Sequence, residues 1–484
     1  MTDSAIAFKS ANELAAMIQQ KTISSEELLD LYLRRVDQFN PDLNAIIVFD
    51  IEKARERARQ ADAATQRGEC WGPLHGVPMT IKESYNIAGL PTTFGNPDFA
   101  NNIADEDALS VQRLLKAGVV IFGKTNVPLA LADFQSYNAI YGTTNNPWGK
   151  TRTPGGSSGG SAAALAAGIT GFECGSDIGG SIRNPAHFCG VFGHKPTWGI
   201  LPPRGHALPG VLAQSDLSVI GPMARSAHDL EIGVLAMAGP DEIQSHGLQL
   251  SLPRARKASL SQYKVAVWST DDMAPVATEV ENRIRGIGET IASAGGQVDY
   301  DARPAFEAST AHDIFQTLLQ ATMSGRIPDG PYRKMQQRAA ALGDDDTSTR
   351  AKTMRRQVAT HRDVLQANEA RTRLRWAWHE FFKEYDAIVT PMMAVSAFEH
   401  DQRPFGERSI MVDDIERPYF EQVFWAGLAI SSYLPATVIP TGPDATGLPI
   451  GAQIIGPEYG DLNTIELASH LEAAGYAFVP PPGY

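Results

Sequence analysis

The chain opens with segments in which apolar and polar residues recur at helical spacing. In residues 24–39, SSEELLDLYLRRVDQF, the apolar side chains return every three or four positions, and Ser24 with Glu27 forms a capping box ahead of them. This pattern predicts an amphipathic helix. The charged segment 52–66 predicts another helix, so we expect residues 1–66 to form a helical N-terminal part.

Short apolar runs between turn residues predict buried strands, at residues 45–49, 77–81, 119–122, 263–268, 388–390, 436–440 and 450–455. Helical patterns lie between several of these runs, at residues 107–117 and 161–167. Strands that alternate with helices indicate an α/β fold, with a mixed central β-sheet flanked by helices. Lys82 follows the run 77–81, so we expect its side chain at the end of a buried strand.

Residues 241–383 carry no motif that points to a chemistry. After the strand expected at 263–268, the segment is mainly helical, and its charged stretch GDDDTSTRAKTMRRQ is expected to be exposed. We interpret residues 241–383 as a mainly helical insertion or cap.

Bulk composition narrows the possible partners. Hydrophobic residues make up 43% of the 484-residue chain and charged residues 20%, which is typical of a globular protein in water. The net charge of −13 disfavours nucleic-acid binding, which needs a positive surface. No apolar run approaches the ~18 residues of a membrane span, and MTDSAIAFKS lacks the features of a signal peptide. We therefore expect a cytoplasmic protein with neither nucleic-acid nor membrane partners.

Cysteine and histidine usage gives no sign of a cofactor. Cys70, Cys174 and Cys189 show neither the numbers of a disulfide scaffold nor metal-ligand spacing. The stretch GVVIFGKT at 118–125 fits the phosphate-loop pattern, but its central residues are predicted to form a strand, whose amides are committed to a sheet. We expect no metal and no cofactor.

Three short glycine-containing segments carry the chemistry: Lys82 in GPLHGVPMTIKE, Ser157 in PGGSSGGSAAALAAG and Ser181 in GSDIGGSIRNPAHFCG. A lysine acts as a base only when it is neutral, and burial lowers its pKa. A serine hydroxyl becomes a strong nucleophile once a base takes its proton. Glycines allow consecutive backbone amides to converge on a developing oxyanion. The three segments predict an amide hydrolase that uses no histidine.

The residues and the order of these segments resemble those of the amidase signature family. The matching stretches are GPLHGVPMTIKE, GVVIFGKTNVP, YGTTNNPW, residues 155–168, GSDIGGSIRNPAHFCGVFGHKPT, YDAIVTP, LPATVIPTG and LPIGAQIIGP. The resemblance implies that Lys82 is the general base, that Ser157 relays the proton from an unusual cis linkage, and that Ser181 is the nucleophile. It also implies a single catalytic domain over residues 1–484, because Lys82 and Ser181 must meet in a core that the C-terminal strands complete.

The turn before the proposed nucleophile is rich in backbone donors. The amides of Ile178, Gly179 and Gly180, together with that of the serine itself, are expected to form an oxyanion hole. Asp177 and Arg183 flank this turn, and we expect them to pair and to support its shape.

The substrate pocket is located by the resemblance alone. NVPLALADFQSYNAIYG occupies the place where family members line the acyl channel, which implies that Leu131, Ala132, Asp133 and Phe134 contact substrate. Leu131 and Phe134 favour an apolar or aryl amide as the small-molecule substrate. The same side chains also fit a purely structural place in the core, and this alternative stays open.

Other functions fit some of the same motifs. Ser157 also matches G-x-S-x-G, but that nucleophile elbow needs a preceding strand, and NPWGKTRTP does not predict one.

Esters, anilides and carbamates suit the same mechanism. A glutaminase-type amidotransferase subunit is the main alternative; such subunits commonly read FASSLDQIGP where this chain reads LAQSDLSVIGP at 212–222, which is closer to the stand-alone amidases. A homodimer is left open.

Overall fold

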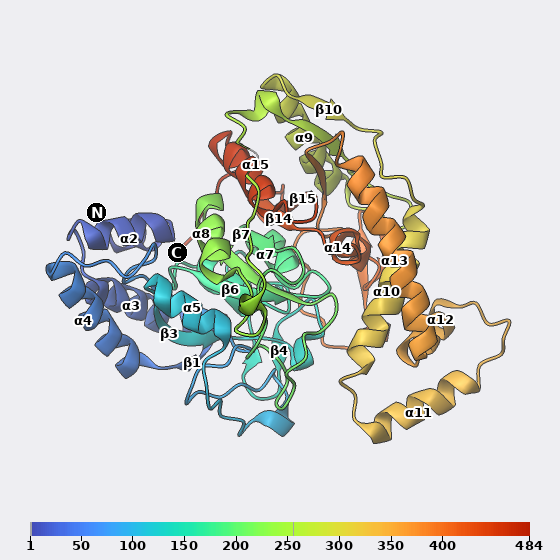
Figure 1. Ribbon diagram of the computed structural model, residues 1–484, viewed down its shortest axis with the longest axis horizontal. Helices are drawn as coiled ribbons and strands as arrows, with labels where there is room; N and C mark the ends of the chain where they lie inside the picture. The colour runs from blue at the N-terminus through green and yellow to red at the C-terminus, as the bar shows by residue number, and fades with distance from the viewer. Residues whose placement is uncertain (1, 255) are drawn as a thin grey trace.

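The computed structural model describes residues 2–254 and 256–484, and two β-sheets form its centre (Figure 1). The smaller sheet has the order β1 (Ile46–Phe49), β3 (Val120–Thr125), β2 (Pro78–Lys82). β3 is antiparallel to β1 and parallel to β2. Lys82 is therefore the last residue within β2 rather than the residue after it, and β3 runs three residues beyond the predicted run.

The larger sheet has eight strands in the order β10-β9-β11-β15-β14-β7-β8-β6. β9 pairs in parallel with β10 and β11. From β11 to β6, every pair of neighbouring strands in the sheet is antiparallel. The prediction of a mixed sheet is confirmed. The strands are β6 (Glu173–Asp177), β7 (Phe192–Lys195), β8 (Val219–Ala224), β9 (Lys264–Val267), β10 (Gln297–Asp299), β11 (Ala387–Pro391), β14 (Ala436–Pro443) and β15 (Pro449–Ile455).

Two short ribbons lie outside these sheets. β4 (Tyr137–Asn138) pairs with β5 (Gly142–Thr143), and β12 (Ser409–Val412) pairs with β13 (Ile415–Pro418).

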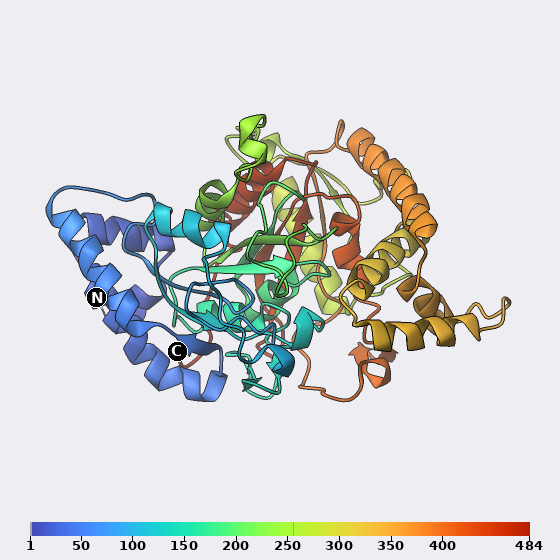
Figure 2. The ribbon, with the colours of Figure 1, turned by 60° about the horizontal axis from the view of Figure 1, so that its bottom comes forward.

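The N-terminal helices pack at one end of the molecule, as the two views agree (Figures 1 and 2). They are α1 (Asp3–Ala7), α2 (Ala11–Gln19), α3 (Ser25–Leu43) and α4 (Ile51–Gln66). The capping box predicted for α3 is present: Ser24 Oγ accepts from the Glu27 amide and the Glu27 carboxylate accepts from the Ser24 amide. α3 extends four residues past its predicted end and stops at Asn44, which has a left-handed backbone.

The two sheets meet where β2 lies beside β6. The Gly171 amide donates to the Pro78 carbonyl at 3.1 Å, and the Thr80 amide donates to Thr170 Oγ1 at 2.9 Å. A side chain on Gly171 would place its Cβ 2.6 Å from the Pro78 carbonyl oxygen, so only glycine permits this approach. The meeting of the sheets brings Lys82 of β2 within hydrogen-bond distance of Ser176 in β6.

Buried helices fill the space around this junction. α6 (Gly159–Ala166), α7 (Arg183–Cys189) and α14 (Val423–Ile430) are buried along their whole length. α5 (Leu109–Ala117), α8 (Ala227–Met237) and α15 (Asp461–Ala473) expose one side and pack with the other.

The segment 241–383 is mainly helical after β9. Its helices are α9 (Thr278–Ser293), α10 (Ala308–Ser324), α11 (Asp329–Ala340), α12 (Thr349–Gln357) and α13 (His361–Phe381). α10 to α13 lie at the end opposite the N-terminal helices, with α11 projecting at the edge (Figures 1 and 2). The charged stretch at 343–357 is largely exposed, with Ala351 as the buried anchor of α12.

Candidate active site

Lys82 is fully buried and lies among three serine hydroxyls. Its Nζ is 2.7 Å from Ser157 Oγ, 2.9 Å from Ser158 Oγ and 2.9 Å from Ser176 Oγ. These serines come from the loop before α6 and from β6, so the site joins the two sheets. The structure thus brings Lys82 and Ser157 into direct contact.

Burial changes the protonation of this lysine. It lowers the pKa of Lys82 from 10.5 to about 7, although the carboxylate of Asp177 acts in the opposite direction. A lysine with such a pKa is neutral in a large fraction of molecules near pH 7. The neutral amine carries a lone pair that can accept a proton from the neighbouring hydroxyl.

The serine loop is held by close backbone contacts. The Gly156–Ser157 peptide bond is cis. A Cβ on Gly156 would lie 2.4 Å from the Asp133 carbonyl oxygen and 2.5 Å from that of Gln135, so this position admits only glycine. The Gly156 amide donates to Asn184 Oδ1 at 3.0 Å, and the Asn184 amide group donates back to the Gly156 carbonyl. These contacts fix the backbone beside Lys82.

Ser181 lies next to this loop through its backbone. Its carbonyl accepts a 3.1 Å hydrogen bond from the Ser158 amide, and the residue is 7% exposed. Among residues 2–254 and 256–484, no hydrogen bond connects the Ser181 hydroxyl to Ser157 or to Lys82. The structure therefore joins Lys82 to Ser157 directly and places Ser181 beside them without that last hydrogen bond.

Asp177 and Arg183 form a buried two-point ion pair. Arg183 Nε lies 3.0 Å from Asp177 Oδ2, and Nη2 lies 2.9 Å from Oδ1. Both side chains are fully buried. Burial would raise the pKa of Asp177, but the Arg183 charge and hydrogen bonds outweigh it and lower the pKa. Arg183 also donates to the Ala426 carbonyl at 3.2 Å and to the Gln453 side chain.

One expected oxyanion donor is used elsewhere. The Gly180 amide donates to Asp177 Oδ1 at 2.8 Å, because the left-handed backbone at Gly180, with φ of 105°, turns this N–H toward the carboxylate. The expectation that Gly180 points into the oxyanion hole is therefore corrected. Within the part of the chain that the structure describes, the amides of Ile178, Gly179 and Ser181 have no intramolecular acceptor.

The expected substrate segment lies against the serine loop, but two of its side chains are engaged elsewhere. The Asp133 carboxylate accepts from Arg408 Nη1 at 2.6 Å and from the Tyr419 hydroxyl at 2.7 Å. Phe134 is 5% exposed and stacks on Phe420 at 5.7 Å between ring centroids. Asp133 is thus a structural anion in this structure.

The other two expected substrate contacts are more accessible. Ala132 is exposed and Leu131 is half-buried. Leu131 has a left-handed backbone with φ of 59°. Both remain candidates for substrate contact.

Polar residues that the sequence motifs did not single out complete the surroundings of Lys82. Ser158 and Ser176 are direct partners, and the second serine of SSGG was the available signal for Ser158. Glu173 was missed as well, although an acidic residue at the start of a fully buried strand is a visible signal. Its carboxyl accepts from Thr80 Oγ1 at 2.5 Å, and burial raises its pKa to about 8.

The histidines near the serine loops make local polar contacts. His187 bonds to the carbonyls of Gly451 and Val395 at 3.0 Å, and His194 lies 3.1 Å from Asp461. Among the described residues, no three His, Cys, Asp or Glu side chains form a group that could hold a metal ion. Nor does any described helix combine the length and apolarity required to cross a membrane.

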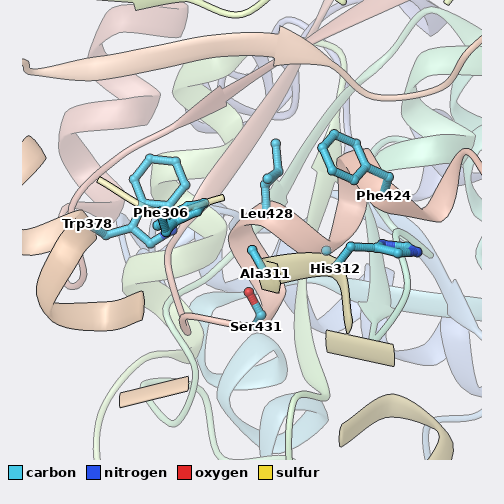
Figure 3. Close-up of a pocket in the computed structure, with 8 residues that line it drawn as sticks. Phe306, Ala311, His312, Trp378, Phe424, Leu428 and Ser431 are labelled. Carbon is cyan, nitrogen blue, oxygen red and sulfur yellow. The ribbon is translucent and has the colours of Figure 1, made fainter. Parts of the chain in front are cut away.

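A small cavity of about 10 Å³, enough for one water molecule, lies between α10, α13 and α14 (Figure 3). Aromatic and aliphatic side chains line it, including Phe306, Trp378, Phe424 and Leu428, with His312 and Ser431 as its polar groups. Ala426, on another side of α14, approaches Gly180. The cavity is therefore separated from the Lys82 site by α14.

The fold and this site define an amide-hydrolysing enzyme. A model of the Amidase family matches residues 27–465, and the chain belongs to that family. It is 30% identical to the A subunit of glutamyl-tRNA(Gln) amidotransferase from Synechococcus sp. (strain CC9605), over 96% of each chain. It is also 30% identical to an acylamidase of Rhodococcus erythropolis, over 98% of this chain and 97% of the relative.

The fold is shared with solved structures. A bacterial aryl acylamidase of the amidase signature family superposes with a TM-score of 0.80 and 23% identity, covering 97% of this chain and 96% of the other. The predicted family, fold class and reaction class are confirmed.

Proposed function

We propose that Lys82, Ser157 and Ser181 hydrolyse small-molecule amides through an acyl-enzyme. The observation that carries the proposal is the 2.7 Å contact between buried Lys82 and Ser157, with the Lys82 pKa lowered to about 7. Neutral Lys82 accepts the Ser157 proton while Ser157 accepts the proton of Ser181. The Ser181 oxygen attacks the amide carbonyl carbon as its O–H bond breaks.

The remaining steps use the same groups in reverse. The amides of Ile178, Gly179 and Ser181, which have no acceptor of their own among the described residues, hold the negative oxygen of the tetrahedral intermediate. The proton returns through Ser157 to the leaving nitrogen, so that a neutral amine departs as the C–N bond breaks. Water then attacks the acyl ester and releases the carboxylic acid and free Ser181. Asp177 and Arg183 keep the turn in place.

We further propose that the acyl side of the substrate is apolar or aryl. The segment carrying Leu131 and Phe134 lies directly against Gly156, and Phe134 belongs to an aromatic group with Tyr419 and Phe420. The similarity to an acylamidase supports cleavage of acyl amides as the reaction. Esters, anilides and carbamates with similar acyl groups are additional substrates of this mechanism.

The similarity to an amidotransferase component favours a second candidate, in which ammonia released from an amide is used by a partner protein. The stretch LAQSDLSVIGP supports the stand-alone enzyme over this alternative. Purified protein assayed on free amides, without partner or ATP, tests the proposal. We expect the wild type to hydrolyse these amides and Ser181→Ala to abolish the turnover. A wild-type protein that hydrolyses no member of a broad amide panel would exclude a stand-alone amidase.

Three aspects of organisation are proposed with the function. Residues 1–484 act as one catalytic domain, since Lys82 and Ser176 come from different sheets yet share a hydrogen bond. Residues 241–383 supply β9 and β10 to the larger sheet, and their helices α10 to α13 form the cap. A cytoplasmic location is supported by three free cysteines. A homodimer remains open, and size-exclusion chromatography with light scattering would decide it.

A further inference from the structure

Arg326 lies just after α10, in the segment 241–383, and extends to a loop of the catalytic core. The side chain is half-buried, and its Nη2 donates to Ser215 Oγ at 3.3 Å. Guanidinium groups carry five N–H donors. The contact with Ser215 is the one hydrogen bond of this guanidinium within the described chain, so most of its donors remain free.

No carboxylate neutralises this cation. Within residues 2–254 and 256–484, Arg326 forms no ion pair, and burial lowers its pKa with no acidic group acting against it. Asp216, adjacent to Ser215, is bound instead by Arg371 at 2.8 Å and by the Tyr433 hydroxyl at 2.7 Å. A partly desolvated charge without a partner costs free energy, and an anionic ligand would offset that cost.

The loop between β7 and β8, which Arg326 contacts through Ser215, also lies next to β2, the strand that carries Lys82. In this loop His206 Nε2 lies 2.9 Å from the hydroxyl of Ser84, two residues beyond Lys82, and the Gly205 carbonyl accepts from the Asn86 amide at 2.9 Å. Burial, together with the charges of Lys82, Arg326 and Lys124, lowers the pKa of His206 to about 3. The imidazole is therefore neutral and supplies no competing charge, and Arg326 lies in the electrostatic surroundings of the Lys82 site.

We propose that Arg326 binds a carboxylate on the amide substrate, away from the scissile bond. Its planar fork matches the two oxygens of a carboxylate. The substrate would then combine an apolar or aryl portion near the scissile amide with an acidic group at the end that approaches Arg326. This inference rests on the proposed amidase function and specifies its substrate class.

The test compares substrates that differ only in charge. One pair is the p-nitroanilide of glutaric acid and that of 5-oxohexanoic acid, in which a methyl ketone replaces the acyl-side carboxylate. A second pair places the acid on the amine side, as N-acyl 4-aminobenzoate against N-acyl 4-aminoacetophenone. The variants are Arg326→Met and Arg326→Lys. Arg338→Met, an exposed arginine on α11, controls for the loss of one positive charge.

In at least one pair, wild type is expected to prefer the acid, chiefly through a lower KM. Arg326→Met should reduce that preference about 10- to 100-fold. Arg326→Lys should retain part of it, and Arg338→Met all of it. Equal preference in wild type and Arg326→Met for both pairs overturns the inference. If Arg326→Met fails to fold, the same comparison is made with Arg326→Lys and Arg326→Gln: an unchanged preference for the acid in Arg326→Gln overturns the inference.

Binding separates this inference from the proposed function. Calorimetric titration of the same pairs onto Ser181→Ala, with and without Arg326→Met, measures the preference without turnover. Selective binding of the acid that needs Arg326 supports the inference even where no substrate is hydrolysed. Hydrolysis of both members of each pair with no Arg326-dependent preference leaves the amidase function standing and rejects the carboxylate site.

Discussion

Asp133 and Arg408 form an ion pair with 2.6 Å between Oδ2 and Nη1, and their side chains are 8% and 4% exposed. The pair joins the segment beside the serine loop to the residues just before β12. Because both carboxylate oxygens accept hydrogen bonds from Arg408 and Tyr419, we infer that Asp133 orients its segment. Its neighbour Phe134 is held in the same region by Phe420.

Removing one member of this pair should destabilise the fold. Arg408→Leu leaves a buried carboxylate without its cation. We expect the free energy of unfolding, measured in urea, to be about 3–5 kcal/mol lower than that of the wild type. Arg403→Leu is the matched control, since Arg403 is 59% exposed in its pair with Asp401, and it should change stability by less than about 1 kcal/mol. Equal effects of the two substitutions would contradict a structural role for the Asp133 pair.

The two serines should fail in different ways. Ser181→Ala is expected to abolish turnover and leave folding intact, because it removes the attacking oxygen. Ser157→Ala should lose most activity yet still bind substrate, because it removes the proton relay. Labelling with a sulfonyl or phosphonate reagent and mass spectrometry should place the adduct on Ser181. An adduct on Ser157 with Ser181 unmodified would instead support a nucleophile elbow.

Activity should rise with pH as the base becomes neutral. The pKa of Lys82 is lowered to about 7, so the active neutral amine dominates above that pH and is lost below it. We expect kcat/KM to increase through about pH 7 and then level off. Lys82→Ala should be nearly inactive, and Lys82→Arg should not restore activity because arginine stays protonated. A fully active Lys82→Ala enzyme would eliminate the mechanism.

Glu173 should make stability depend on pH. Its folded-state pKa is raised from 4.5 to about 8, so the folded state holds a proton that the unfolded state releases between those values. Wild type should therefore lose stability relative to Glu173→Gln as pH rises from about 4.5 to about 8, by at most about 1.4 kcal/mol per pH unit. Urea unfolding of both proteins across this range measures the difference. A constant difference would show that Glu173 is ionised in the fold.

Acyl-chain length probes the proposed channel. Each buried methylene contributes about 0.8 kcal/mol, so kcat/KM should grow a few-fold per carbon until the channel is full. Phe134→Ala should flatten this trend while small amides are still hydrolysed, whereas Phe405→Ala, in the same aromatic group but 39% exposed, should retain it. Identical profiles for wild type and Phe134→Ala would assign Phe134 to the core.

Features with local determinants could be predicted from the sequence. The Ser24–Glu27 capping box marked the start of α3, and the Asp177–Arg183 pair could be expected because the two residues are six positions apart. The partners of Asp133 could not be foreseen, since Arg408 and Tyr419 lie 275 and 286 residues away. The direction of the Gly180 amide also escaped prediction, because it depends on one positive φ angle and on a carboxylate that competes for the same N–H.

The acceptors of Arg183 have a consequence for biosynthesis. The Ala426 carbonyl and the Gln453 side chain follow Arg183 by 243 and 270 residues. At a translation rate of about 5–20 residues per second, the ribosome adds them roughly 10–50 seconds later. The nascent polypeptide therefore carries the turn around Ser181 long before that turn has its final supports. A product of premature termination that lacks Gln453 would leave the turn unfinished, and we expect it to lack hydrolytic activity.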